Sequence, residues 1–290
     1  MFKGSIVALV TPFKKGKVDK ERLLKLIEFH IQEGSDGVVP CGTTGESATL
    51  SHDEHKEVVN IVVEAVNKRI PVIAGAGSNC TTESIDLAKH AKKVSADAIL
   101  AVTPYYNKPT QNGLYEHYAT IAKEVDIPII LYNVPTRTGV NLLPETVARL
   151  SKIDNIVGIK EATGDLKQQS KIVELCREDF VLLSGDDFTL LPTLSIGGVG
   201  VISVVANIVP KDVANLIKEF NKGNMDKAKK LHYKIFPLCE AMFIETNPVP
   251  VKEALEMMGM ISHEVRLPLV RLEKTNQEKL RETLRTYGLI

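Results

Sequence analysis

One lysine stands where a strongly apolar stretch ends. Lys160 lies in the segment G-I-K-E-A-T-G-D, residues 158–165, directly after Ile156 and Val157. Removing a lone ammonium group from water is costly, so a buried lysine tends to lose its proton, and the neutral amine can form a Schiff base with a ketone. The alternative is a strand-end lysine whose charged head reaches solvent along its apolar stem.

A phenol lies at the end of the preceding apolar stretch. Tyr132 could project beside Lys160 and pass a proton to and from a carbinolamine. An aromatic residue at this position could instead serve only to cap the core. Chemistry at this pair therefore depends on the fold bringing the two strand ends together.

Two further segments could hold carboxylates. Gly42-Thr43-Thr44-Gly45 supplies two hydroxyls and backbone N–H groups near a helix start, which suits a carboxylate, although Gly and Thr are also ordinary in a tight turn. Arg137 lies in Y-N-V-P-T-R-T-G, where a guanidinium could bind a second carboxylate through two parallel hydrogen bonds. Its alternative interpretation is a solvated surface charge.

Eight short, β-branched and fully apolar segments must position these groups. Apolar residues at every position, without alternation, are typical of parallel strands covered on both faces. The eight predicted strands are Ser5–Val10, Gly37–Val39, Pro71–Ala74, Ala98–Thr103, Pro128–Tyr132, Ile156–Lys160, Val181–Ser184 and Val199–Val204.

Helical patterns separate the strands. Apolar residues three and four apart predict helices over Lys20–Gln32, Asp53–Asn67, Ser84–Lys93, Gly113–Lys123 and Pro144–Leu150. Ser51 with Glu54 forms a capping box, and Pro144 suits a first helical turn. Eight alternations favour a (β/α)₈ barrel, a TIM barrel of the α/β class, in which catalytic groups gather at the carboxyl ends of the strands.

No buried strand is evident after Pro210. The patterns over Asp212–Asn221, Met225–Phe243, Pro250–Met258 and Gln277–Tyr287 predict helices. We therefore expect a barrel catalytic domain over residues 1–224 and a C-terminal helical domain over residues 225–290.

Composition disfavours several classes of function. The 290 residues contain 36 Lys plus Arg and 36 Asp plus Glu without a dense basic cluster, so neither a nucleic-acid binder nor a protein of acidic membranes is indicated. The four cysteines form no C-x-x-C pair, no signal peptide or membrane span is evident, and a cytoplasmic location is expected. Asp186-Asp187 has no accompanying histidine, so a loop cap is favoured over a metal site.

The order of the motifs resembles one enzyme family. G-T-T-G-E-S-A-T-L, V-T-P-Y-Y-N, Y-N-V-P-T-R-T-G, G-I-K-E-A-T-G and L-S-G-D-D follow one another as in the dihydrodipicolinate synthase family of pyruvate-dependent class I aldolases, within the N-acetylneuraminate lyase superfamily. The resemblance covers nearly the whole chain. It implies a lyase of lysine and diaminopimelate biosynthesis that condenses pyruvate with L-aspartate-4-semialdehyde and cyclises the product, forming 4-hydroxy-tetrahydrodipicolinate without a cofactor or metal.

The resemblance also assigns roles at matching positions. Lys160 would form the Schiff base, and the proton relay would consist of Tyr132, Thr43 and Tyr106, the last supplied by a neighbouring subunit. The residues that would bind substrate are Thr44, Arg137, Gly185 and Ile202. The family is usually a homotetramer, a dimer of dimers, and its feedback inhibitor L-lysine would bind at Ser47, Ala48, His52, His55, Asn79, Glu83 and Tyr105.

Three alternatives stay open at this point. Sister families that act on N-acetylneuraminate or 2-keto-3-deoxy sugar acids share the lysine and the tyrosine, whereas Arg137 favours a short acidic acceptor. A catalytically silent ligand sensor would be expected to lack one of the two residues. His52 and His55, three apart on a predicted helix, could suggest a metal, but surface-exposed side chains are the favoured interpretation.

Overall fold

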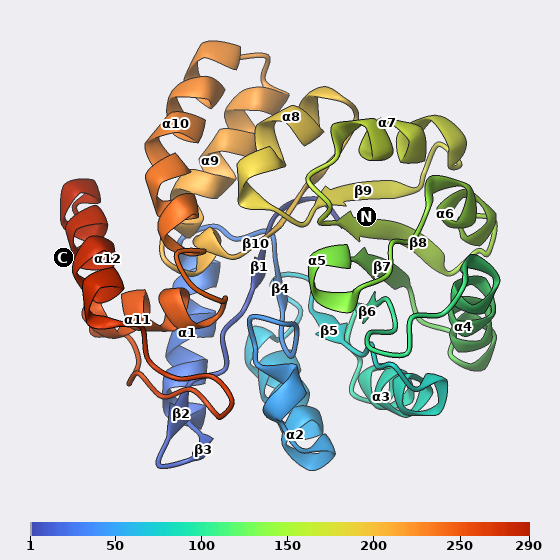
Figure 1. Ribbon diagram of the computed structural model, residues 1–290, viewed down its shortest axis with the longest axis horizontal. Helices are drawn as coiled ribbons and strands as arrows, with labels where there is room; N and C mark the ends of the chain where they lie inside the picture. Colours follow the sequence, from blue (N-terminus) through green and yellow to red (C-terminus); the bar gives the residue numbers. More distant parts are fainter. Residues whose placement is uncertain (1) are drawn as a thin grey trace. The chain divides into compact units, whose positions relative to one another are not determined.

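The structure, a computed structural model, describes residues 2–290 and comprises two compact units (Figure 1). Unit 1 is Pro71–Ile202 with the N-terminal residues up to Gly4, and unit 2 is Ser5–Ile70 with Ser203–Ile290. Lys160, Tyr132, Tyr106 and Arg137 therefore belong to unit 1.

Unit 1 is built on parallel strands that follow one another in chain order across the sheet. The strands are β5 (Ile73–Gly75), β6 (Ala98–Val102), β7 (Ile129–Asn133), β8 (Ile156–Glu161), β9 (Val181–Ser184) and β10 (Gly200–Ser203). Its helices, seen outside the strands in Figure 1, are α3 (Thr81–Lys93), α4 (Gln111–Glu124), α5 (Pro135–Thr138), α6 (Pro144–Leu150), α7 (Leu166–Leu175) and α8 (Leu190–Ser195). Core residues and helices cover both faces of the strands, which are therefore mostly apolar, with polar residues concentrated at their carboxyl ends.

The register of β7 and β8 decides which side chains become neighbours. Tyr132 pairs with Lys160, and Asn133 pairs with Glu161. Since successive strand residues point to opposite faces, each pair lies on its own face of the sheet. The catalytic candidates therefore share one face, and the polar pair Asn133 and Glu161 lies on the other.

Unit 2 combines the beginning and the end of the chain. Strand β1 (Gly4–Ala8) pairs in parallel with β4 (Gly37–Val39), and β2 (Phe13–Lys14) forms a short antiparallel hairpin with β3 (Lys17–Val18). Its helices are α1 (Lys20–Gln32), α2 (His52–Val66), α9 (Pro210–Asn221), α10 (Met225–Ala241), α11 (Val249–Met257) and α12 (Lys274–Tyr287). Short 3₁₀ helices, η1 (Ser47–Thr49) and η3 (Val205–Asn207), complete it.

The predicted fold class, a (β/α)₈ barrel with additional C-terminal helices, is confirmed by these eight parallel strands and their intervening helices. The capping box is also confirmed, because Ser51 Oγ accepts from the Glu54 N–H while the Glu54 carboxylate accepts from the Ser51 N–H. The β2–β3 hairpin was not predicted, since two-residue strands have no periodicity. The domain boundary between residues 224 and 225 stays a prediction.

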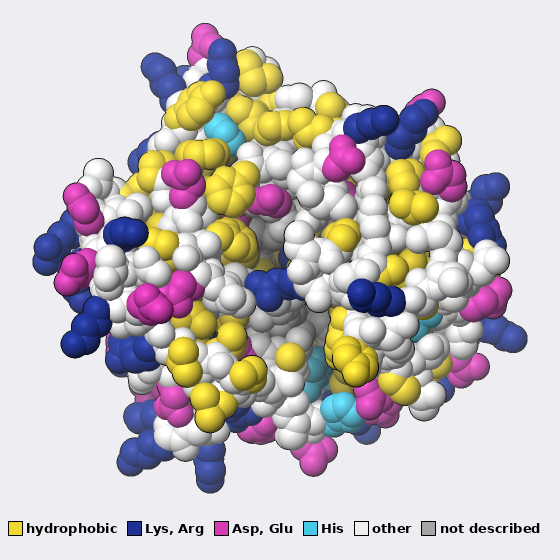
Figure 2. Space-filling model, in the orientation of Figure 1, with side chains coloured by type: hydrophobic (Ala, Val, Ile, Leu, Met, Phe, Trp, Pro, Cys, Tyr) yellow, Lys and Arg dark blue, Asp and Glu magenta, His cyan; other side chains and the backbone are white. Residues whose placement is uncertain are grey.

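The surface carries charges of both signs. Figure 2 shows Lys and Arg side chains interspersed with Asp and Glu over the face in view, with no large area of one sign. Within residues 2–290, no helix has both the length and the apolar character needed to cross a membrane.

Candidate active site

Lys160 and Tyr132 lie side by side at the carboxyl ends of β8 and β7. Their side chains are only 5% and 6% exposed, and Lys160 Nζ lies 4.3 Å from the centroid of the Tyr132 ring. Among the described residues of unit 1, Lys160 Nζ makes no hydrogen bond or ion pair. The amine is thus buried against a phenol without a carboxylate bound to it.

Asp186 interacts electrostatically with Lys160. Burial raises the pKa of Asp186 and the like charge of Asp187 adds to this, whereas the Phe188 N–H and the Lys160 amine oppose it. Asp186 Oδ1 accepts from the Phe188 N–H at 3.0 Å and caps the 3₁₀ helix η2 (Asp187–Thr189). The predicted loop cap is therefore confirmed.

A polar network that the sequence did not predict lies behind this pair. Glu161 is fully buried, and its carboxylate accepts from Asn133 Nδ2 at 2.9 Å, from the Thr163 N–H at 2.8 Å and from Gln168 Nε2 at 3.2 Å. Burial raises the pKa of Glu161 and these hydrogen bonds counteract the rise. The network fixes the end of β8 directly after Lys160.

The same network holds the segment that carries Arg137. Asn133 Oδ1 accepts from the Leu142 N–H at 3.0 Å, while Asn133 Nδ2 donates to Asn141 Oδ1 at 2.7 Å. Arg137 lies on α5 with an exposed side chain, as expected of a group that meets a ligand from solvent. Asn133 therefore ties the end of β7 to both β8 and the Arg137 loop.

Gly185 directly follows β9, and Ile202 lies within β10. The Gly185 N–H donates to the Glu161 carbonyl at 2.7 Å, so this N–H is already used within the sheet. A Cβ at position 185 would lie 2.6 Å from the Ala162 Cβ, so glycine is required by the close approach of the two segments. Ile202 is fully buried.

In unit 2, the turn Gly42–Ser47 carries Thr43 and Thr44. The Gly42 carbonyl accepts from the N–H groups of Gly45 and Ser47, and Thr44 Oγ1 accepts from Asn247 Nδ2 at 3.0 Å. Thr44 is 2% exposed, whereas Thr43 is half-buried. A turn with two hydroxyls and several N–H groups is chemically suited to a carboxylate.

Tyr106 stands apart from the other relay candidates. Its side chain is 90% exposed, and its backbone has a φ of 72°. The left-handed region is unfavourable for a bulky residue and costs about 1–3 kcal/mol where the surroundings impose it. With 90% of its side chain exposed, Tyr106 points away from the interior of its own chain.

The residues predicted to bind L-lysine are divided between the units. Unit 2 holds Ser47, Ala48, His52 and His55, and unit 1 holds Asn79, Glu83 and Tyr105. The expectation that both histidines are surface-exposed is wrong for His55, which is 7% exposed because the inner face of α2 carries it, whereas His52 is exposed.

Within unit 1, the predicted lysine-binding residues already have partners. Glu83 Oε2 accepts from Ser78 Oγ at 2.6 Å, and the Asn79 carbonyl accepts from Asn107 Nδ2 at 2.9 Å. Tyr105 is 40% exposed. The carboxylate of Glu83 is thus oriented by its own loop.

A buried lysine next to a tyrosine, at the carboxyl ends of adjacent strands of a (β/α)₈ barrel, is the arrangement of a Schiff-base aldolase. That is the class of enzyme that the fold and the site define.

Within this class, the chain belongs to the dihydrodipicolinate synthetase family, which matches residues 1–287. It is 60% identical over 290 residues to 4-hydroxy-tetrahydrodipicolinate synthase of Syntrophus aciditrophicus and 62% identical to that of Thermodesulfovibrio yellowstonii. Each match covers 100% of both chains. The family predicted from the sequence is confirmed.

Solved structures of enzymes from the same family have closely similar folds. A chloride-inhibited dihydrodipicolinate synthase of Acinetobacter baumannii in complex with pyruvate has a TM-score of 0.98 and 48% identity, with 100% of both chains covered. The enzyme of Cyanidioschyzon merolae with lysine bound has a TM-score of 0.97 and 41% identity, covering 100% of this chain and 99% of the other.

Proposed function

We propose that this protein is a lyase that condenses pyruvate with L-aspartate-4-semialdehyde and cyclises the product, the reaction of a 4-hydroxy-tetrahydrodipicolinate synthase in the diaminopimelate route to lysine. Relatives at about 60% identity over their full length carry that name. The single observation that carries the chemistry is the Lys160 amine, buried against Tyr132 and without an ion-pair partner in its unit.

The first half of the reaction forms an imine. The Lys160 amine attacks the keto carbon of pyruvate, and Tyr132 protonates the departing hydroxyl, so that one water is lost and the imine remains. Loss of a methyl proton gives the enamine. Tyr132, Thr43 and Tyr106 would relay these protons, while Thr44 and the main chain near Gly185 and Ile202 would hold the substrate carboxylate.

The second half joins the two substrates. The enamine carbon adds to the aldehyde, whose own carboxylate would be bound by Arg137. The amino group of the acceptor then attacks the imine carbon, closes the ring and releases Lys160 as the free amine. The exposed position of Arg137 supports this role, because the second substrate enters after the imine has formed.

Borohydride trapping tests the proposal directly. Pyruvate plus borohydride should add the mass of a reduced pyruvyl group, and peptide mapping should place it on Lys160, while Lys160→Ala should give no adduct. An adduct on another lysine, or none at all, would contradict the mechanism and favour a ligand sensor. Faster turnover with a sugar aldehyde than with L-aspartate-4-semialdehyde would instead indicate a sugar-acid aldolase.

We also propose that a second copy of the chain completes the site. Tyr106 is 90% exposed, which supports donation of its hydroxyl to a neighbouring subunit. A homotetramer built as a dimer of dimers is the proposed assembly. Mixing inactive Lys160→Ala chains with inactive Tyr106→Phe chains should restore activity if the site is shared, and no recovery after subunit exchange would exclude sharing.

L-lysine is the proposed feedback inhibitor. A lysine-bound relative supports it, as does Glu83, whose carboxylate could take the ligand's amino group. Activity should fall at millimolar L-lysine in the wild type and not in Glu83→Ala. An inhibition curve that is flat for both proteins would reject the proposal.

A further inference from the structure

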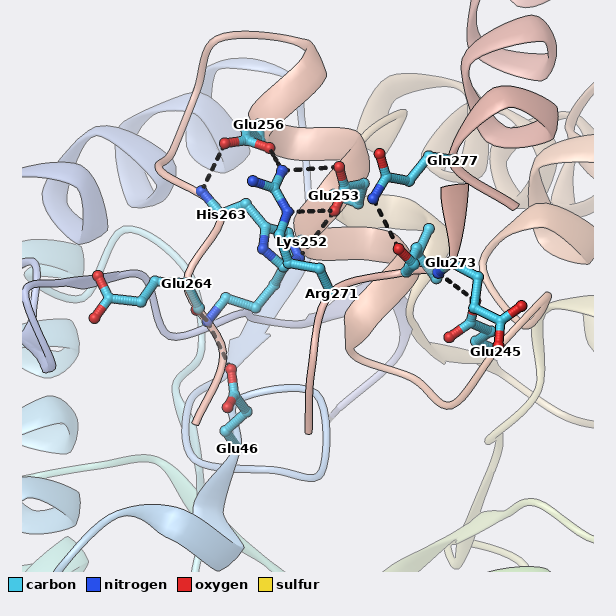
Figure 3. Close-up of polar contacts among 11 residues, drawn as sticks. Glu46, Glu245, Lys252, Glu253, Glu256, His263, Glu264, Arg271, Glu273 and Gln277 are labelled. Carbon is cyan, nitrogen blue, oxygen red and sulfur yellow. Dashed lines mark hydrogen bonds and ion pairs between the residues drawn. The ribbon is translucent and has the colours of Figure 1, made fainter. Parts of the chain in front are cut away.

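Lys252 is a buried cation that the proposed mechanism does not use. It lies on α11 with its side chain fully buried, and its Nζ donates to Glu46 Oε1 at 2.6 Å, to the Thr11 carbonyl at 2.9 Å and to the Glu264 carbonyl at 2.5 Å. Figure 3 shows the side chain extending toward Glu46. The Phe13 ring lies beneath it, 4.2 Å from Nζ to the ring centroid.

The partner, Glu46, belongs to the turn Gly42–Ser47. Its carboxylate is almost wholly buried, and its second oxygen, Oε2, accepts from the Arg266 N–H at 3.1 Å. Its backbone has a φ of 54° and a ψ of 37°, the left-handed conformation that side-chain-bearing residues rarely adopt. Contacts with α11 and the segment after it therefore hold the turn in a conformation it would not favour alone.

A second contact reaches the same turn from the residues before α11. Asn247 is buried and donates from Nδ2 to Thr44 Oγ1 at 3.0 Å. Because a hydroxyl that accepts a hydrogen bond can still donate its own hydrogen, the Thr44 O–H remains available to another acceptor and points away from Asn247. Asn247 thus orients the hydroxyl of a residue proposed to bind the substrate carboxylate.

We propose that Asn247 and Lys252 are positioning residues, which act through Thr44 and Glu46 to hold the turn Gly42–Ser47 in the conformation that binds the carboxylate of a 2-oxo acid. This inference rests on the proposed function for the identity of that substrate. The contacts that fix the turn do not depend on the identity of the substrate. Asn247 lies 203 residues from Thr44 in the sequence, and Lys252 lies 206 residues from Glu46.

The test compares Asn247→Ala with Arg271→Gln. Arg271 belongs to the polar cluster of Figure 3, but its carboxylate partners, Glu253 and Glu256, lie on α11 and not on the turn. Asn247→Ala should raise the pyruvate concentration that gives half-maximal borohydride trapping by about tenfold, the loss of one buried hydrogen bond. Arg271→Gln should leave it within about twofold of wild type.

A second measurement needs no substrate. Hydrogen–deuterium exchange of peptides covering residues 40–50 should be faster in Asn247→Ala and in Lys252→Met than in wild type, and unchanged in Arg271→Gln. Should Lys252→Met fail to fold, Asn247→Ala carries the test.

The two measurements separate failure of the inference from failure of the function. If the wild type traps no pyruvate, the proposed function fails and the exchange of residues 40–50 still decides the inference. If Asn247→Ala is folded, traps pyruvate as the wild type does and leaves exchange unchanged, the inference is overturned. Equal changes in Arg271→Gln would also overturn it, since they would show a general loss of stability.

Discussion

Two lysines are buried among residues 2–290, one in each unit, and their ammonium groups have very different surroundings. Lys252, in unit 2, has three oxygen acceptors and an aromatic ring against its ammonium group. Lys160, in unit 1, lies against the Tyr132 ring and has no hydrogen-bond acceptor among the described residues of that unit.

The difference separates a structural cation from a reactive amine. Burial lowers the pKa of Lys252, and the charge and hydrogen bond of Glu46 partly oppose that shift by favouring the ammonium form. A paired ammonium group has no lone pair to offer a ketone. Lys160, which has no hydrogen-bond or ion-pair partner among the described residues of unit 1, is therefore the lysine available for Schiff-base chemistry.

Replacing each lysine by methionine should give the sharpest contrast. Lys160→Met should reduce turnover by about 10⁴-fold or more, because it removes the nucleophile itself. Its free energy of unfolding should stay within about 1 kcal/mol of wild type or exceed it, since methionine fills the space without a buried unpaired amine. Steady-state kinetics and urea unfolding measure the two effects. A large loss of stability in Lys160→Met would show that Lys160 also has a structural role, as Lys252 does.

Lys252→Met should destabilise the protein by about 3–5 kcal/mol, because it leaves the Glu46 carboxylate buried without its cation. Urea unfolding followed by circular dichroism measures this. The double variant Glu46→Gln/Lys252→Met should recover part of the loss, since neither charge then remains. If the double variant were as unstable as the single one, the ion pair would not be the cause.

Tyr132→Phe should lower turnover by about 10²- to 10³-fold with little change in stability, because the hydroxyl is lost while the ring against Lys160 is kept. Trapping of pyruvate should become slower but still reach Lys160. Rapid trapping with unchanged turnover would show that another group transfers the proton.

Acid should weaken both units through buried neutral histidines. Burial lowers the pKa of His30 in unit 2 to about 3 and that of His117 in unit 1 to about 4. Below the unfolded value of about 6.5, the unfolded chain gains protons that the folded chain does not. The free energy of unfolding is therefore highest above pH 6.5 and falls as the pH is lowered. At pH 5 each of these histidines should reduce it by about 2 kcal/mol.

Urea unfolding at pH 7.5 and pH 5 tests this expectation. His30→Gln should reduce the pH dependence, because glutamine does not titrate. His52→Gln is the matched control, since His52 is exposed on the neighbouring helix α2. An unchanged pH dependence in His30→Gln would show that His30 is not responsible for the loss.

Much of the fold follows from local patterns. Gly37–Val39, Val181–Ser184 and the helices Lys20–Gln32 and Pro144–Leu150 have the predicted bounds. The ends of the other predicted strands lie at most two residues from the observed ones. The ladder of β7 and β8 continues into Asn133 and Glu161, whose polar side chains lack the apolar character that predicts a strand.

The candidate site was only partly predictable. Lys160 and Tyr132 were identified because both stand at the ends of apolar strands. The networks around Glu161 and Lys252 were not predicted, because their hydrogen-bond partners lie far apart in the sequence and are brought together only by folding. A buried charge such as Lys252 is recognised only when its partner is known, and Glu46 lies 206 residues away.

The sequence by itself determined the alternation of strands and helices, and with it the (β/α)₈ class, because apolar periodicity and capping act within a few residues of each position. It also determined the family, through the order of five motifs. Only the tertiary structure decided that Lys252 is paired with Glu46, and that Lys160 has no ion-pair partner within the described part of unit 1. Burial and pairing depend on residues brought together by folding, and electrostatic free energies in a low-dielectric interior are set by those neighbours and not by residue type.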